Sequence, residues 1–126
     1  MRFHLVSTCG IPDPVFDDEE PLRSGLLTMF LADMRGQEDF YLAELARAEQ
    51  GENVDNLYNN LVHVYPERDV VHIEDMMPPS VGETEAEGPL VGTTLTMAEA
   101  KQLIHDWKDA QIKWREAHAH EVQPPC

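Results

Sequence analysis

The sequence predicts an α+β fold in which a small antiparallel β-sheet packs against a C-terminal amphipathic helix and a second helix. The sheet is indicated by residues 61–75, LVHVYPERDVVHIED, where apolar and polar side chains alternate on both sides of a short turn. The C-terminal helix is indicated by residues 97 to 114, where side chains of a mostly apolar stripe recur at alternating spacings of three and four. A chain of 126 residues is long enough for one modest core, so residues 1–126 are expected to form a single domain.

The first third of the chain is expected to contain a strand, a loop and a second buried segment. Residues 2–8, RFHLVST, predict a first strand, although the alternation is imperfect. Residues 11–21, IPDPVFDDEEP, hold three prolines and four consecutive acidic residues and predict a loop. Residues 26–34, LLTMFLADM, form a dense apolar run between Gly25 and Gly36, and their short length favours a strand over the alternative, a buried helix.

Residues 37–51, QEDFYLAELARAEQG, predict a helix. The segment begins with acidic residues, which suit a helix N-terminus, and is rich in alanine, leucine and glutamate. Tyr41, Leu45 and Ala48 fall on one face, and Gly51 is placed to end the helix in a left-handed conformation. The polar stretch that follows, ENVDNLYNN, predicts a connector.

The predicted hairpin has one apolar face and one mostly polar face. With a four-residue turn at 66–69, Val64 would lie opposite Val71 and Val62 opposite Ile73, which gives a wholly apolar inner face. The other face would carry Leu61, His63, Tyr65, Val70, His72 and Glu74. This alternation is typical of an antiparallel sheet with one face on the core.

The last third is expected to be a long loop followed by a helix and a tail. Residues 76–92, MMPPSVGETEAEGPLVG, are rich in proline, glycine and glutamate and predict an acidic loop. Residues 96–99, TMAE, form a capping box that starts the helix. The buried face of the helix is predicted to contain Met97, Ala100, Ile104, Trp107, Gln111 and Trp114. Residues 116–126 are expected to fray into a tail.

The charge of the chain limits its partners. Twenty-four acidic residues against nine lysines and arginines give a net charge of −15. Such a chain repels nucleic acid and anionic membrane, so neither is expected as a direct partner, and it should be attracted to a basic protein. The alternative is that the acidity serves only solubility. We expect a cytoplasmic location, because there is no membrane-length apolar run or signal-peptide core, and nothing in the placement of Cys9 and Cys126 requires a disulfide.

Two histidine patterns are candidates for chemical sites. The four-residue turn would place His63 opposite His72, and with Glu74 they have the ligand count of a catalytic zinc site or could act as acid and base. No cationic residue is nearby to hold a phosphate, so the favoured interpretation is the outer face of a sheet. His118 and His120 lie two residues apart in the expected tail and would bind a metal weakly. We therefore expect no catalytic residue, no metal site and no cofactor.

The acidic residues are the main candidates for function. They form a run before the apolar segment, surround the hairpin and alternate in the long loop. With one aromatic residue, the expected partner-binding residues are Asp17, Asp18, Glu19, Glu20, Tyr65, Glu67, Asp69, Glu74, Asp75, Glu83, Glu85 and Glu87. Such a surface could imitate the charge of nucleic acid and cover a basic active site, whereas the alternative is a merely solvated surface.

The order of these segments resembles the small acidic immunity proteins of bacterial polymorphic-toxin and contact-dependent growth inhibition systems. The resemblance covers about residues 37–115. The matching positions are Leu42, Leu45, Gly51, Val71, Ile73, Glu74, Leu95 and Trp107. It implies an inhibitor without catalysis that binds one cognate toxin domain, frequently a basic nuclease, and occludes its active site or substrate groove.

In this interpretation a few buried anchors would supply most of the affinity, and Tyr65, Tyr58 and Met76 are the candidates. Three alternatives stay open. The first is a phage anti-defence protein or nucleic-acid mimic, and the second is a small metal-dependent enzyme that uses His63, His72 and Glu74. The third is an adaptor unrelated to any toxin.

Overall fold

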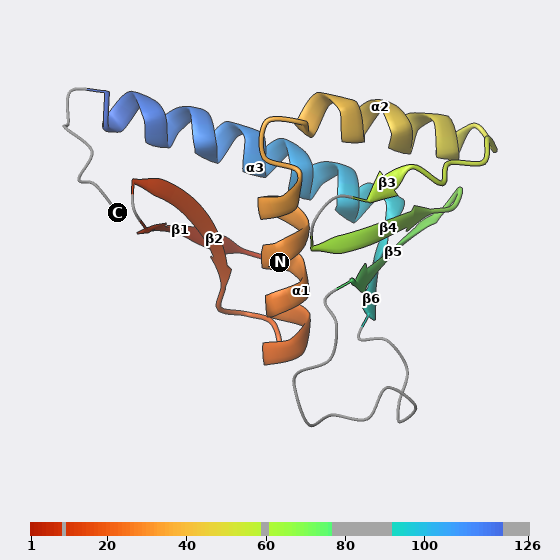
Figure 1. Ribbon diagram of the computed structural model, residues 1–126, viewed down its shortest axis with the longest axis horizontal. Coiled ribbons are helices and arrows are strands. Elements are labelled where there is room, and N and C mark those ends of the chain that lie inside the picture. Colours follow the sequence, from red (N-terminus) through yellow and green to blue (C-terminus); the bar gives the residue numbers. More distant parts are fainter. Residues whose placement is uncertain (9, 59–60, 77–91, 120–126) are drawn as a thin grey trace.

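The structure is a computed structural model that describes residues 1–8, 10–58, 61–76 and 92–119. Its elements confirm the predicted α+β class (Figure 1). In chain order they are β1 (Phe3–Thr8), β2 (Ile11–Phe16), α1 (Pro21–Asp33), α2 (Glu38–Glu49), β3 (Leu57–Tyr58), β4 (Val62–Pro66), β5 (Val70–Asp75), β6 (Gly92–Thr96) and α3 (Met97–Ala117).

The strands form two antiparallel sheets with α1 between them. β1 and β2 make a two-stranded sheet, and the second sheet has the order β3-β4-β5-β6. Helix α1 contacts β2 and also β4, β5 and β6, and Figure 1 shows it standing between the two sheets while α2 and α3 lie side by side above them. All three helices and both sheets contribute to one core, whose largest fully buried side chains are those of Trp107, Tyr41 and Phe30.

The prediction of a strand at residues 26–34 was wrong. Residues 26–33 belong to the 13-residue helix α1, in which Leu26, Leu27, Phe30 and Leu31 are buried at helical spacing, and Met34 is the C-cap. The helix begins five residues before the apolar run, at Pro21, and the carboxylate of Glu20 caps it. Proline is favoured in the first turn of a helix because its missing N–H group would have no partner there. The two residues that start this helix, Glu20 and Pro21, therefore lie in segment 11–21, for which the prolines predict a loop.

The prediction of a loop at residues 11–21 was also wrong for its first half. Residues 11–16 form β2, in which Pro12, Pro14 and Phe16 are buried while the residues between them are less so. Among the described strands β2 pairs only with β1, so one of its edges makes no ladder. Prolines are tolerated on such an edge strand because no N–H group is needed on that side.

The prediction of a helix at residues 37–51 was confirmed, with α2 spanning Glu38–Glu49. Gly51 adopts φ 91°, and its N–H donates to the carbonyl of Ala48 at 2.9 Å (N to O). The polar connector that follows contains the two-residue strand β3, which was not predicted, and β6 was missed as well. Both are short and lack a clear alternation of apolar and polar residues. They are recognised as strands only by their pairing with β4 and β5, which their own sequences do not indicate.

The hairpin was predicted with the correct faces and the wrong register. The N–H of Glu67 donates to the carbonyl of Val70 at 2.7 Å (N to O), so the loop has two residues and not four. As a result Val64 lies opposite Ile73, and not opposite Val71. A shift of two residues leaves every side chain on its original face, because side chains alternate with a period of two. The apolar pattern therefore determines the inner face and leaves this shift undetermined.

The C-terminal helix was predicted correctly in its start and its buried face. It extends to Ala117, so the first residues of the expected tail are helical. Trp107 is fully buried, whereas Trp114 is half-buried and stacks on His118 with ring centroids 4.2 Å apart. The rest of the tail, 120–126, and the acidic loop 77–91 lie outside the described residues, as do Cys9, His120 and Cys126.

The capping box at the start of α3 allows a first prediction. The Glu99 N–H donates to Thr96 Oγ1 (3.1 Å), and the Thr96 N–H donates to Glu99 Oε1 (2.9 Å). The backbone hydrogen bond from Thr96 lowers the pKa of Glu99. We expect Thr96→Ala to lower the free energy of unfolding by about 1 kcal/mol, since an N–H of the first turn loses its acceptor.

Urea unfolding followed by circular dichroism measures this loss. Thr94→Ala is the matched control, because Thr94 is an exposed threonine of the same strand whose side chain caps nothing. Its effect should stay within about 0.5 kcal/mol. Equal losses in the two variants would contradict a specific role for the Thr96 cap.

Candidate partner-binding surface

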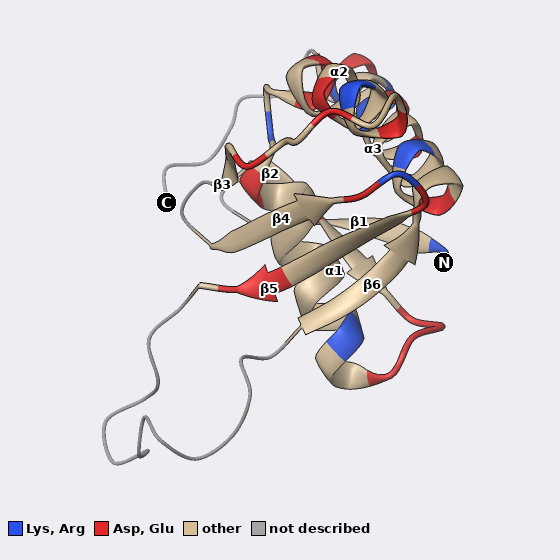
Figure 2. Ribbon diagram, turned by 90° about the vertical axis from the view of Figure 1, so that its right-hand side faces the viewer, with Lys and Arg blue, Asp and Glu red and all other residues tan. Residues whose placement is uncertain are grey.

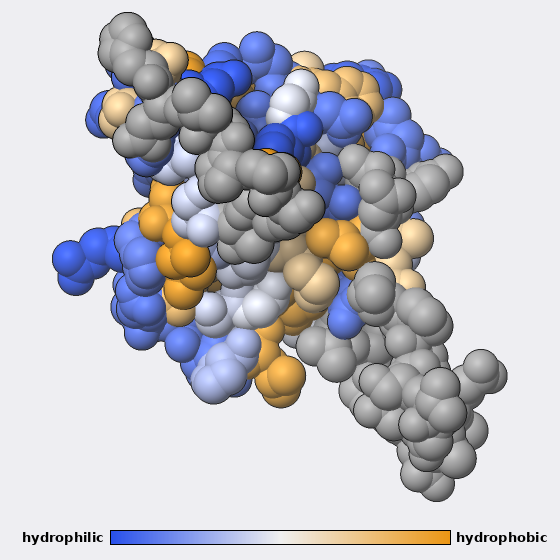
Figure 3. Space-filling model, turned by 60° about the vertical axis from the view of Figure 1, so that its left-hand side comes forward, coloured by the Kyte–Doolittle hydropathy of each residue, from blue (hydrophilic) through white to orange (hydrophobic). Residues whose placement is uncertain are grey.

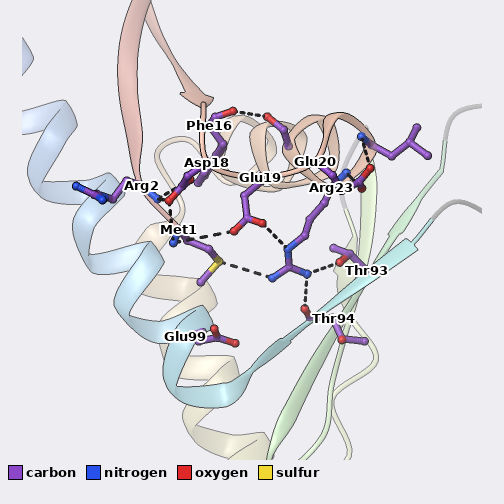
Figure 4. A network of polar contacts seen from close by, with 12 residues as sticks. Met1, Arg2, Phe16, Asp18, Glu19, Glu20, Arg23, Thr93, Thr94 and Glu99 are labelled. Carbon is purple, nitrogen blue, oxygen red and sulfur yellow. Dashed lines mark hydrogen bonds and ion pairs between the residues drawn. The ribbon is translucent and has the colours of Figure 1, made fainter.

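The acidic run at residues 17–20 lies between β2 and α1, where its carboxylates bind other groups of the protein (Figure 4). Asp18 accepts from the backbone N–H of Arg2, with N to Oδ2 at 3.0 Å, and this hydrogen bond lowers the pKa of Asp18. Glu20 caps α1 by accepting from the N–H of Arg23, with N to Oε1 at 2.6 Å. Two of the four carboxylates therefore stabilise local backbone structure.

Glu19 joins a network that connects α1 to β6. Its Oε2 lies 3.2 Å from Nε of Arg23, and the Nη1 of Arg23 donates to the hydroxyl of Thr93 and the carbonyl of Thr94. Figure 4 shows this guanidinium between the carboxylate and the strand. In contrast, Asp17 is 73% exposed, and its one ion pair with a described residue is to the exposed His4, with Oδ2 to Nδ1 at 2.8 Å. Of the four predicted partner-binding residues in this run, Asp17 is thus the one least engaged with the rest of the protein.

The two histidines of the hairpin do not face each other, which corrects the predicted pair. In the observed register His63 lies opposite Glu74, and His72 lies opposite Tyr65. The rings of His63 and Tyr65 are in contact, with centroids 3.8 Å apart. His72 Nε2 lies 3.0 Å from Oε2 of Glu67. The physical reason is the two-residue loop, which moves each residue of β5 by two positions relative to β4.

This register weakens the metal-enzyme alternative. A catalytic zinc needs three protein ligands that converge on one point. In the part of the chain that the structure describes, no three histidine, cysteine, aspartate or glutamate side chains are grouped to hold a metal ion. His63, His72 and Glu74 therefore share a face of the sheet without forming the required triad.

The hairpin keeps an acidic surface because its only cation points elsewhere. The guanidinium of Arg68 lies against Gly51, in the space that a side chain at this position would fill. It therefore covers the C-terminal end of α2, where the helix dipole favours a positive charge. The carboxylates of Asp69 and Glu74 make no hydrogen bond or ion pair with any described residue. Glu67 is 65% exposed. The charge of this surface is thus available to a partner.

Exposed apolar side chains accompany these acidic residues. Tyr65 is 38% exposed and Met76, directly after β5, is 45% exposed. Figure 2 shows the four-stranded sheet in front of α1, with acidic segments at the β4–β5 turn and at the end of β5. On the face drawn in Figure 3, the orange patches are separated by hydrophilic side chains. The outer face of the hairpin therefore combines the exposed Tyr65 with the carboxylate of Glu74, which has no partner among the described residues.

The outer surface of β4 and β5 is defined here by His63, Tyr65, Glu67, His72 and Glu74, and is called the hairpin surface. Asp69 and the half-buried Asp75 lie at its two ends. Sequence reasoning missed its neighbour Thr94, which lies opposite His72 on β6, because β6 itself was not predicted. Three of the predicted residues, Glu83, Glu85 and Glu87, and the side chain of Tyr58 lie outside the described part of the chain.

Comparisons of the chain with protein-family models, with curated proteins and with solved structures find no match. Among the described helices, none combines the length and the apolar character required to cross a bilayer.

Proposed function

We propose that this protein is a bacterial immunity protein that binds a basic toxin domain, in particular a nuclease domain, and occludes its active site or substrate groove. The observation that carries the proposal is the hairpin surface, where the exposed Tyr65 lies near the carboxylate of Glu74, which makes no hydrogen bond or ion pair with a described residue. The protein would act in the cytoplasm by binding alone, without catalysis, metal or cofactor.

In the proposed complex, charge speeds the encounter of the two proteins, and apolar contact supplies most of the affinity. A net charge of −15 attracts a cationic domain from a distance and speeds the encounter. Affinity then depends on a few side chains that become fully buried in the interface, and Tyr65 and Met76 have the size and exposure for this role. Nucleic acid would be repelled by the same charge, so the toxin and not its substrate is the proposed partner.

The proposal is tested with the basic C-terminal domain of the toxin encoded next to this protein. We expect a one-to-one complex by size-exclusion chromatography and loss of the toxin's nuclease activity at equimolar ratio. The association rate should fall as salt is added, because the screening length shortens from about 10 Å at 0.1 M to about 3 Å at 1 M ionic strength. Lysozyme, a basic protein, is the control for unspecific charge attraction.

Absence of a complex at micromolar concentrations would contradict the proposal. Equal binding of lysozyme and the toxin domain would do so too, because it would reduce the interaction to net charge. A specific complex with a basic host-defence protein, in place of the toxin, would support the phage anti-defence alternative.

A further inference from the structure

We infer that the hairpin surface is the docking site for the toxin and that it takes an arginine side chain of the partner, stacked on Tyr65 and bound by Glu74. This inference rests on the proposed function and adds to it the binding face and the chemistry that the face recognises.

The first step concerns which acidic groups are free to bind a partner. Asp18, Glu19 and Glu20 hold together β1, α1 and β6 through the hydrogen bonds and ion pairs described above. Using them for a partner would break those contacts and lose their stabilisation. The carboxylates of Glu74 and Asp69 have no such internal role among the described residues. Between these two acidic clusters, binding a partner at the hairpin therefore disturbs the fold less.

The second step concerns the arrangement of aromatic and acidic groups. In the observed register, Tyr65 and His63 on β4 lie beside His72 and Glu74 on β5. The ring of His63 lies against Tyr65, which supports the tyrosine from one side while 38% of Tyr65 stays exposed. Glu74 ends this block of rings at one side, and Glu67, next to His72, ends it at the other. A planar cation over the tyrosine would thus meet the carboxylate of Glu74 at one end, while Glu67 at the other end already lies 3.0 Å from Nε2 of His72 (Oε2 to Nε2).

The third step concerns the identity of the cation. A guanidinium is planar and weakly hydrated, so it stacks on an aromatic face and pairs with a carboxylate at the same time. An ammonium is a compact and strongly hydrated charge that cannot stack in this way. Gly92 lies opposite Glu74 on β6 and has no side chain to cover that carboxylate on the outer face. The surface therefore matches an arginine better than a lysine.

The test uses the whole chain, labelled with ¹⁵N, and two short peptides as probes: acetylated hexa-arginine amide and the matching hexa-lysine amide. We expect the largest backbone amide shifts at residues 63–65, 67 and 70–75, with hexa-arginine binding more tightly than hexa-lysine. The double variant Tyr65→Ala/Glu74→Gln should weaken hexa-arginine binding about tenfold, the sum of one stacking contact and one exposed ion pair.

The matched control is Ile112→Ala/Asp109→Asn on α3. It also removes one carboxylate and one side chain that is 38% exposed, at a place away from the hairpin. We expect this control to bind hexa-arginine within about twofold of the unmodified chain, because net charge changes equally in the two variants. Thermal unfolding confirms that both variants are folded. Largest shifts on α2 and α3, or equal weakening in the two double variants, would overturn the inference.

The same variants separate this inference from the proposed function. If the toxin domain binds the unmodified chain and Tyr65→Ala/Glu74→Gln equally well, the docking face is wrong and the immunity function stands. If the toxin domain binds neither, while hexa-arginine still maps to the hairpin surface, the immunity function is wrong and the arginine-binding surface stands.

Discussion

Asp33→Ala is expected to lower the free energy of unfolding by about 3 kcal/mol, since it leaves two backbone N–H groups without their acceptor. Asp33 is the last residue of α1 and is only 8% exposed. Its Oδ2 accepts from the backbone N–H groups of Leu61 (3.2 Å) and Val62 (3.3 Å), where the chain enters β4. A carboxylate at a helix C-terminus is unfavourable by itself, and these hydrogen bonds help to stabilise it there.

Urea denaturation at neutral pH measures this effect. Asp33→Asn retains one acceptor oxygen and should lose less than the alanine variant, which identifies hydrogen bonding as the cause. Asp109→Ala is the control for removal of an aspartate from an exposed site, and we expect a change within about 0.5 kcal/mol. A loss below about 1 kcal/mol for Asp33→Ala would show that Leu61 and Val62 find other acceptors.

Alkaline pH is expected to destabilise the protein through Tyr41. This side chain is buried in the core, with its ring 6.5 Å from that of Phe30 (centroid to centroid). Burial raises the pKa of Tyr41 to about 12, and the negative charge of Asp33 contributes. In the unfolded chain the tyrosine loses its proton near pH 10, whereas the folded protein keeps it until about pH 12. The folded state therefore binds more protons in this window.

The sign follows from this difference in bound protons. The stabilisation is fully present below pH 10 and is lost as the pH rises from 10 to 12, by about 2 to 3 kcal/mol in total. Urea unfolding at a series of pH values across this window measures the slope. Tyr41→Phe should remove this part of the slope, while Tyr65→Phe, which changes an exposed tyrosine, should keep it. The same slope in all three proteins would assign the alkaline loss to other groups.

The periodic segments of this protein could be predicted from the sequence. The capping box and the spacing of apolar residues placed α3 and its buried face, because a helix must bury one stripe of side chains. The alternation in residues 61–75 placed the inner face of the hairpin for the analogous reason in a strand. The excess of acidic residues suggests a basic partner without reference to the fold, since net charge depends only on composition.

Other features depend on tertiary contacts. The register of β4 and β5 depends on a two-residue loop, and a shift by two residues leaves the apolar pattern unchanged. The run at 26–34 is helical because α1 packs between two sheets and is capped by Glu20, which the apolar run itself does not reveal.

The candidate site depends on tertiary contacts in the same way. Acidic residues look alike in a sequence, yet Glu19 is bound to Arg23, whereas Glu74 lies on the outer face of the sheet and has no partner among the described residues. Residue types and their spacing are enough to determine the net charge and the faces of the regular elements. Which carboxylates remain accessible to a partner depends on groups far apart in the sequence, so this is determined only when the chain folds.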